Sequence, residues 1–372
     1  MQNYEFNTAN ANSLNVLIAP LDWGLGHTTR CIPVVKALLQ RHCNVFIACN
    51  HWQQSFLERE CGNLTYIKLE GYNIQYSKNR LFLKIASQSL KIKKRIKAEN
   101  KVLEEILTQY NIDWIISDNR YGLFHPKVFS TIITHQLQLQ LPGWLSFFQP
   151  VANKFIKKYL AHFNNIWVPD NEGQPNMGGC LSHSSHTDLP LVYIGSLGRF
   201  KPGIHSPDSA KKVAVILSGI EPQRSILESV IMSQAGTCKD FEFTLVRGTN
   251  NGPDTTFTGC KVVNIAGSRE LETILNNNSI IICRSGYSSV MDYLPLNKTC
   301  IFIPTPGQTE QEYLADYLSA GQLSLAYKQA GFDLEKALKE ASGNRLKTFL
   351  SVPALETAID ASISYVVKRK NG

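Results

Sequence analysis

Residues 280–292 read IIICRSGYSSVMD, and this stretch decides the fold. Its first four residues are apolar, an Arg-Ser-Gly turn follows, and the remaining residues have helical spacing. A short apolar run that leads through a turn into a helix is typical of a buried strand in a parallel sheet. Residues 14–40 repeat the unit, because LNVLIA is followed by a glycine loop and a second helical pattern.

The same alternation extends over most of the chain. Strands are predicted at residues 14–19, 44–48, 114–117, 131–134 and 166–168, and again at 213–217, 241–246, 261–265, 280–283 and 299–303. Helices are predicted near residues 28–40, 223–232, 270–276, 288–294, 310–318 and 353–368. Strands that alternate with helices form parallel sheets covered on both faces. The predicted fold class is therefore α/β, with two Rossmann-like domains in tandem.

A segment rich in Gly, Pro and Ser separates the two series of strands and predicts an interdomain linker. The chain has 372 residues, which exceeds the size that one hydrophobic core usually supports. The expected organisation is a flexible tail at residues 1–13, a first domain at 14–198, a linker at 199–209, a second domain at 210–352, and a C-terminal helix at 353–372 that bridges both domains.

The composition indicates a globular protein, with 43% hydrophobic and 18% charged residues. No apolar run is long enough to cross a bilayer, and residues 1–13 lack the features of a secretion signal, so we expect a cytoplasmic protein. The nine cysteines include no C-x-x-C pair, which argues against a disulfide framework and a zinc site. Residues 1–200 carry 20 Lys and Arg against 13 Asp and Glu, whereas the remainder carry 18 against 17. The basic first half predicts an anionic partner.

The glycine loop at residues 24–30, GLGHTTR, follows the first strand and places His27 at the carboxyl edge of the sheet, where ligands bind in α/β proteins. The loop lacks the third glycine of a dinucleotide-binding fingerprint. Asp118 ends another strand at the same edge, and a carboxylate beside a histidine can orient it and raise its basicity. A catalytic pair is one interpretation; helix capping by His27 and turn capping by Asp118 is the other.

The Ser-Gly turn of the second domain opens a helix whose first turn carries the hydroxyls of Ser288 and Ser289. Backbone N–H groups and hydroxyls at such a position can bind a diphosphate, and Asp292 lies one turn further along, within reach of a ribose. An ordinary serine-capped turn is the alternative.

Residues 283–292, CRSGYSSVMD, together with 303–313, IPTPGQTEQEY, resemble the UDP-sugar site of glycosyltransferase family 28. The resemblance implies the GT-B architecture, in which two parallel sheets face each other across a cleft. It extends to residues 24–27, to 134–136 (THQ), which is similar to a His-Glu-Gln segment near the acceptor, and to 195–199 (GSLGR), which is similar to an interdomain turn whose Arg faces the donor. Two departures are Asp292 in place of Glu and Gln136 in place of the acidic residue.

Site residues follow from the resemblance and from the polar cluster after residue 117. The donor-binding residues that we predict are Gly26, Arg199, Ser218, Gly219, Arg284, Ser285, Gly286, Tyr287, Ser288, Ser289, Asp292, Gln308 and Gln311. The predicted acceptor-binding residues are Asn119, Arg120, His135 and Gln136, and the predicted catalytic residues are His27 and Asp118.

The sequence contains no Asp-x-Asp and no recognisable nucleic-acid-binding motif, so we expect neither a metal, a cofactor nor a nucleic acid partner. Basic residues between 91 and 101, and aromatic residues between 144 and 159 with three nearby lysines, predict either solvated and core-facing helices or a surface that contacts an anionic membrane.

These features predict an enzyme that transfers a hexose or N-acetylhexosamine from a UDP-sugar to the hydroxyl of a carbohydrate or lipid-linked acceptor. A cytoplasmic enzyme peripheral to the inner face of the membrane would suit such an acceptor. A UDP-sugar epimerase or hydrolase on the same fold, or a non-catalytic nucleotide-sugar-binding protein, remains the alternative.

Overall fold

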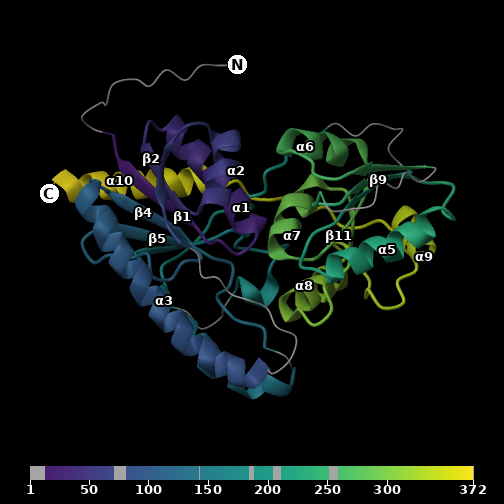
Figure 1. Cartoon of the computed structure of the whole chain (residues 1–372), viewed down its shortest axis with the longest axis horizontal. Helices are drawn as coiled ribbons and strands as arrows, with labels where there is room; N and C mark the ends of the chain where they lie inside the picture. Colours follow the sequence, from purple (N-terminus) through teal and green to yellow (C-terminus); the bar gives the residue numbers. More distant parts are fainter. Residues whose placement is uncertain are drawn as a thin grey trace.

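The computed structural model describes residues 13–70, 81–141, 143–183, 188–203, 211–250 and 259–371. It shows two parallel α/β units side by side (Figure 1). Residues 1–12 of the predicted tail and residues 204–209 of the predicted linker lie outside the described residues.

Within the described residues, the first domain has a parallel sheet of seven strands in the order β3-β2-β1-β4-β5-β6-β7. The strands are β1 (Asn15–Pro20), β2 (Asn44–Cys49), β3 (Thr65–Lys68), β4 (Trp114–Asp118), β5 (Phe129–Ile133), β6 (Asn165–Val168) and β7 (Leu191–Tyr193). Its helices are α1 (Leu25–Gln40), α2 (His51–Cys61), α3 (Leu81–Gln109) and α4 (Gln149–Leu160), with short 3₁₀ turns η1 (Gly143–Phe148) and η2 (Gly179–Leu181).

The described part of the second domain repeats the plan with six parallel strands in the order β10-β9-β8-β11-β12-β13. The strands are β8 (Lys212–Ile216), β9 (Glu242–Val246), β10 (Cys260–Val263), β11 (Ile280–Cys283), β12 (Thr299–Phe302) and β13 (Leu325–Ala326). The helices are α5 (Gln223–Ala235), α6 (Ser268–Asn277), α7 (Tyr287–Tyr293) with the 3₁₀ turn η4 (Leu294–Leu296), α8 (Thr309–Ala320), α9 (Leu334–Gly343) and α10 (Leu355–Asn371).

The predicted fold class is confirmed: both sheets are parallel, and all ten predicted strands are present within two residues of their expected ends. The strands that sequence reasoning missed, β3, β7 and β13, are the outer strands of their sheets. Outer strands are short and half-exposed, so they lack the continuous apolar run that marks a buried parallel strand.

Each sheet reverses its strand order at the centre, between β1 and β4 in the first domain and between β8 and β11 in the second. Ligands of open α/β sheets bind outside the carboxyl ends of strands at such a switch point. His27 lies in the first turn of α1, which follows β1, and Asp118 ends β4, while the Ser-Gly turn follows β11. The topology therefore places the predicted residues of each domain at its own switch point.

The two domains pack closely against each other. One apolar cluster includes Val34 of α1, Ile18 of β1 and Met291 of α7, so the hydrophobic core continues across the domain boundary. The chain returns to the first domain after residue 349, and Figure 1 shows α10 lying against that domain. There Arg41 forms an ion pair with Asp360. No described helix is both long enough and apolar enough to span a membrane.

Candidate active site

The glycine loop of the first domain touches the Ser-Gly turn of the second. A Cβ atom added at Gly26 would lie 2.3 Å from the Oγ of Ser288, which is closer than real Cβ contacts come. Glycine at position 26 therefore allows the N-terminal turn of α1 to contact α7. Figure 1 shows these two helices next to each other at the domain boundary. The contact joins the two switch points into one site between the domains.

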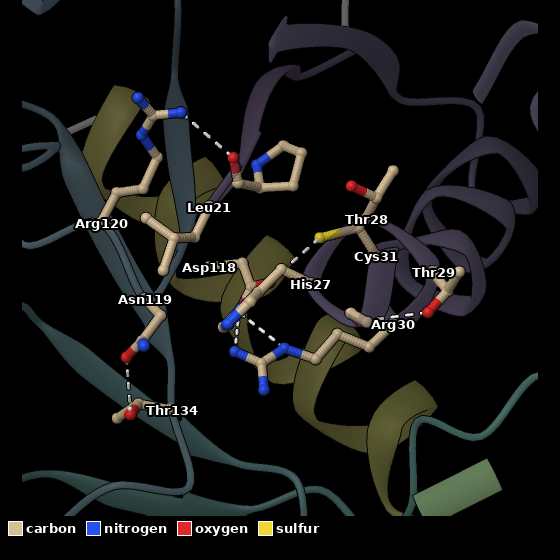
Figure 2. Close-up of polar contacts among 12 residues, drawn as sticks. Leu21, His27, Thr28, Thr29, Arg30, Cys31, Asp118, Asn119, Arg120 and Thr134 are labelled. Atoms are coloured by element: carbon tan, nitrogen blue, oxygen red, sulfur yellow. Dashed lines mark hydrogen bonds and ion pairs between the residues drawn. The ribbon is translucent and has the colours of Figure 1, made fainter. Parts of the chain in front are cut away.

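His27 and Asp118 lie together, as the sequence predicted. The Nδ1 atom of His27 is 3.1 Å from the Oδ2 atom of Asp118, which is fully buried. Figure 2 shows the Asp118 carboxylate between His27, Arg30 and Cys31. Arg30 donates from Nε to Asp118 Oδ1 over 2.7 Å, and its second terminal nitrogen bonds to the same oxygen. Asp118 thus serves two partners rather than the histidine alone.

Arg30 changes the acid–base behaviour expected of His27 and Asp118. Burial lowers the pKa of His27 below its ordinary value of 6.5, the Arg30 cation lowers it further, and the opposing effect of Asp118 is smaller. Asp118 raises the pKa of His27, as predicted, but burial and the Arg30 cation outweigh this effect, so the net shift is downward. Burial acts to raise the pKa of Asp118, but the net shift is downward because Arg30 and His27 stabilise the anion.

Burial and the Arg30 cation keep the His27 imidazole neutral at neutral pH. Since Asp118 can only accept, the Nδ1 atom of His27 carries the proton. None of the described residues hydrogen-bonds to the Nε2 atom of His27, whose side chain is 16% exposed. A neutral, oriented imidazole with a free nitrogen is equipped to accept a proton.

A carboxylate from the second domain faces this group. Glu310, in the first turn of α8, accepts a hydrogen bond of 2.7 Å from the Nε2 atom of Gln136 and lies 3.4 Å from the Nε2 atom of His135. The other ring nitrogen of His135 lies 3.4 Å from a terminal nitrogen of Arg30. Both predicted residues of the 134–136 segment therefore contact the opposite domain.

Tyr287 also crosses the domain boundary. Its ring stacks on His135 with the ring centres 3.8 Å apart and the planes 9° from parallel, and its hydroxyl donates to the Pro169 carbonyl over 2.9 Å. The Tyr287 side chain is only 3% exposed. It therefore belongs to the domain interface, and the predicted donor contact does not involve its ring.

The hydroxyls of Ser288 and Ser289 make no hydrogen bond to the described part of the protein, and both residues are half-buried. Ser218 and Gly219, at the end of β8, are exposed. Gly219 has φ 99°, a left-handed backbone that favours glycine. These residues and Gly286, at the N-cap of α7, form the accessible part of the predicted donor site.

Three residues that we predicted to contact a ligand have enclosed side chains that bond within the protein. Arg284 is 1% exposed and donates to the carbonyl oxygens of Ile303, Pro304 and Gln223 and to the Oε1 atom of Gln329. The hydroxyl of Ser285, also buried, donates to the Gln311 carbonyl. Both side chains fix the loops around the donor site.

Arg120 is the third case. Its guanidinium is fully buried and bonds to Glu99 and to the carbonyl oxygens of Pro20 and Glu70. Figure 2 shows it pointing away from His27 and Arg30. Arg120 therefore ties together the ends of strands in the first domain. Its neighbour Asn119, with φ 56°, accepts from Thr134 over 3.0 Å.

Asp292 and Arg199, which we predicted to contact the donor separately, bind each other. The backbone and guanidinium of Arg199 donate to both carboxylate oxygens of Asp292 over 2.8 to 3.3 Å. Asp292 is 6% exposed, so Arg199 and the surrounding residues cover most of its carboxylate. Gln308 and Gln311 are half-buried; Gln311 bonds to Gln308 and accepts from the backbone of Thr305.

Sequence reasoning missed Arg30 and gave Glu310 no role. Arg30 lies one helical turn after His27, and a search of the same helix face would have found it. Glu310 carried no such signal, because its contacts reach across the domain boundary. Among the described residues, no group of three or more His, Cys, Asp or Glu is arranged to hold a metal ion.

Comparisons with known proteins agree with this geometry. Residues 214–362 match the model of the glycosyltransferase family 28 C-terminal domain. The second domain is a family 28 glycosyltransferase domain. Over 187 residues, the chain is 28% identical to the UDP-N-acetylglucosamine--N-acetylmuramyl-(pentapeptide) pyrophosphoryl-undecaprenol N-acetylglucosamine transferase of Sulfurihydrogenibium sp. (strain YO3AOP1). The matched region covers 49% of this chain and 52% of the relative, so the chain spans about half the length of that relative.

Solved structures identify the fold of the whole chain. The glycosyltransferase SnogD from Streptomyces nogalater has a TM-score of 0.65 at 12% identity, with 95% of this chain and 100% of that one covered. MurG from Acinetobacter baumannii has a TM-score of 0.52 at 10% identity, with 96% and 95% covered. The chain is thus a GT-B protein with a family 28 domain, and glycosyl transfer is the reaction class that these comparisons support.

Proposed function

We propose that this glycosyltransferase moves a hexose or N-acetylhexosamine from a UDP-sugar to an acceptor hydroxyl without a metal ion. One observation carries the proposal: His27, whose Nε2 atom no described residue bonds, follows Gly26 in the first turn of α1, and Gly26 touches Ser288, whose hydroxyl also has no partner among the described residues. A proton acceptor and a donor loop therefore meet at one point of the domain boundary.

In the proposed reaction, His27 Nε2 accepts the proton of the acceptor hydroxyl as the oxygen attacks the anomeric carbon. The bond from that carbon to the UDP oxygen breaks, and UDP leaves with the bonding electrons. The imidazolium that forms is stabilised by Asp118, which lies 3.1 Å from Nδ1. A single displacement of this kind inverts the anomeric configuration.

The departing diphosphate needs stabilisation that a metal ion provides in other enzymes. We assign this role to the hydroxyls of Ser288 and Ser289 and to the backbone N–H groups of the turn that contains Gly286. Hydrogen-bond donors that are already in place stabilise developing charge without a cost of reorganisation. Gln308 and Gln311 are proposed to contact the sugar, since both lie at the start of α8 beside the turn.

The acceptor is proposed to be lipid-linked, because the Sulfurihydrogenibium relative is named for transfer to a pyrophosphoryl-undecaprenol acceptor. On the first domain, Phe147 is 70% exposed and Val151 is 66% exposed, beside Lys154, Lys157 and Lys158 of α4. Exposed apolar side chains next to lysines suit an anionic membrane surface. We therefore propose that the enzyme is cytoplasmic and binds peripherally to the inner face of the membrane.

The test is a transfer assay with a panel of radiolabelled UDP-sugars and a polyprenyl diphosphate-linked sugar acceptor, in EDTA. The proposal predicts label in the lipid fraction and stoichiometric UDP. UDP release that is independent of acceptor would indicate a hydrolase, and an altered sugar without UDP release would indicate an epimerase. Loss of transfer on EDTA treatment, restored by Mg²⁺ or Mn²⁺, would contradict the metal-independent mechanism.

A further inference from the structure

A continuous series of polar contacts links the second domain to His27. It starts at Glu310 in α8, passes to His135 after β5, continues to Arg30 in α1, and ends at Asp118 and His27. The heavy atoms of successive members are 2.7 to 3.4 Å apart. The series therefore crosses the domain boundary once, between Glu310 and His135.

Each contact in the series has a definite direction. A guanidinium can only donate, so Arg30 requires the Nδ1 atom of His135 to accept. With Nδ1 as the acceptor, the ring proton of His135 is on Nε2, where it faces the carboxylate of Glu310. At the other end, Arg30 donates to Asp118, and Asp118 accepts from the Nδ1 atom of His27. Each contact in the series therefore pairs a donor with an acceptor, and the Nε2 atom of His27 is left to act as the base.

The second domain holds His135 from two sides. Tyr287 stacks on the face of the ring, and Glu310 meets its Nε2 edge. Burial acts to raise the pKa of Glu310, but His135 and Gln136 outweigh that effect and lower the pKa to about 2. Glu310 is therefore a carboxylate at neutral pH, and its side chain is 31% exposed.

We propose that Glu310 is a positioning residue for the transfer reaction: through His135 and Arg30 it holds Asp118 and His27 in the geometry that proton transfer requires. The base is then complete only while the donor-binding domain is seated on the acceptor-binding domain. This inference rests on the proposed function. It also explains Gln136, because the carboxylate expected in that segment is supplied by the opposite domain.

The first experiment compares Glu310→Gln with Glu312→Gln in the transfer assay. Glu312 lies in the same helical turn and accepts a hydrogen bond from the backbone of Gly307, so it is a matched control for the loss of charge. We expect Glu310→Gln to lower kcat about 10-fold with an unchanged KM for the UDP-sugar, and Glu312→Gln to leave both unchanged. Equal kinetic parameters for the two variants and the wild type would overturn the proposal.

The pH profile separates positioning from a purely structural role. His27 is faced by Arg30 and Cys31 of its own helix, by Asp118 of β4, by His135, and by Glu310 of α8. Loss of the Glu310 charge removes a group that favours protonated His27. The acid limb of kcat should move to lower pH in Glu310→Gln, whereas an unchanged limb would contradict the proposed link.

Nitrogen NMR of histidine-labelled full-length protein tests the arrangement independently of any substrate. We expect His135 as the Nε2–H tautomer and His27 as the Nδ1–H tautomer, and we expect Glu310→Gln to broaden or shift both. The reverse tautomers would overturn this inference even if transfer is observed. If the wild type shows no transfer but has the expected tautomers, the proposed function fails while the contact series stands.

The double variant Gln136→Glu with Glu310→Gln moves the carboxylate to the first domain. The proposal predicts partial recovery of kcat over Glu310→Gln alone, because a carboxylate again lies beside His135. No recovery in a double variant with wild-type thermal stability and the wild-type tautomers would contradict it.

Discussion

The loops at the two switch points differ in how their polar groups are used. In the first domain, Asp118 is fully buried and bonded to both His27 and Arg30. In the second, Ser288 and Ser289 present hydroxyls that no described residue bonds. A group that must hold a proton acceptor in one orientation needs fixed partners, whereas a site for a phosphate needs free donors. This difference supports the proposal that the first domain prepares the base and the second receives the donor.

Removal of the base should produce the largest effect. His27→Ala is expected to slow transfer by about 10² to 10⁴, the usual contribution of general-base catalysis, and to leave UDP affinity unchanged. Steady-state kinetics and calorimetry on the same preparation measure the two quantities. A wild-type turnover rate in His27→Ala would place the base elsewhere.

The buried ion pair predicts a large effect on stability. Asp118→Ala leaves the buried Arg30 guanidinium without its anion, and breaking such a pair costs about 3–5 kcal/mol of unfolding free energy. Urea titration measures the change. The control is Asp188→Ala, whose partner Lys157 is about half exposed, and we expect no measurable loss there. Equal stability of the two variants would contradict the role of the buried pair between Arg30 and Asp118 in holding the first domain's site in place.

The donor loop should respond in affinity rather than in stability. Ser288→Ala and Ser289→Ala are each expected to weaken UDP binding by about 1 to 2 kcal/mol, since each removes a hydrogen bond to a charged group. Neither should lower the unfolding midpoint, because neither hydroxyl has a described partner. Titration calorimetry and thermal denaturation check both statements. A lower unfolding midpoint with unchanged UDP affinity would contradict the assignment of Ser288 and Ser289 to UDP binding and would indicate a structural role.

The pH dependence of transfer follows from the environment of His27. Its pKa is lowered from 6.5, so the folded protein disfavours the protonated form. Catalysis by the neutral ring should therefore persist below pH 6.5 and fall only as the pH drops through the lowered pKa. The same shift implies that the unfolded state binds more protons there, so stability also decreases on acidification. An acid limb of kcat above pH 6.5 would contradict this environment.

The remaining prediction concerns binding to the membrane. Replacement of Lys154, Lys157 and Lys158 by Glu should weaken sedimentation with anionic liposomes, because each well-placed lysine contributes about 1 kcal/mol near such a surface. Binding should also weaken with added salt. Failure of the wild type to bind anionic liposomes at low salt would move the acceptor into solution.

The sequence predicted the central strands and the meeting of His27 with Asp118, because parallel strands bring their carboxyl ends to one edge. It did not predict that Arg120 and Arg284 are enclosed, because the sequence around a charged residue after a strand does not show whether its side chain faces the cleft or bonds to backbone carbonyls. Contacts such as Glu310 with His135 depend on how two domains are seated, and that arrangement has no local sequence pattern.

Calorimetric titration of UDP into EDTA-treated wild-type protein tests the central claim most directly, because it asks whether the second domain receives a uridine diphosphate without a metal ion. We predict one site per chain, competition by the UDP-sugar that serves as donor, and weaker binding in Ser288→Ala. No detectable heat of binding at millimolar UDP, or binding that requires Mg²⁺ or Mn²⁺, would contradict the account.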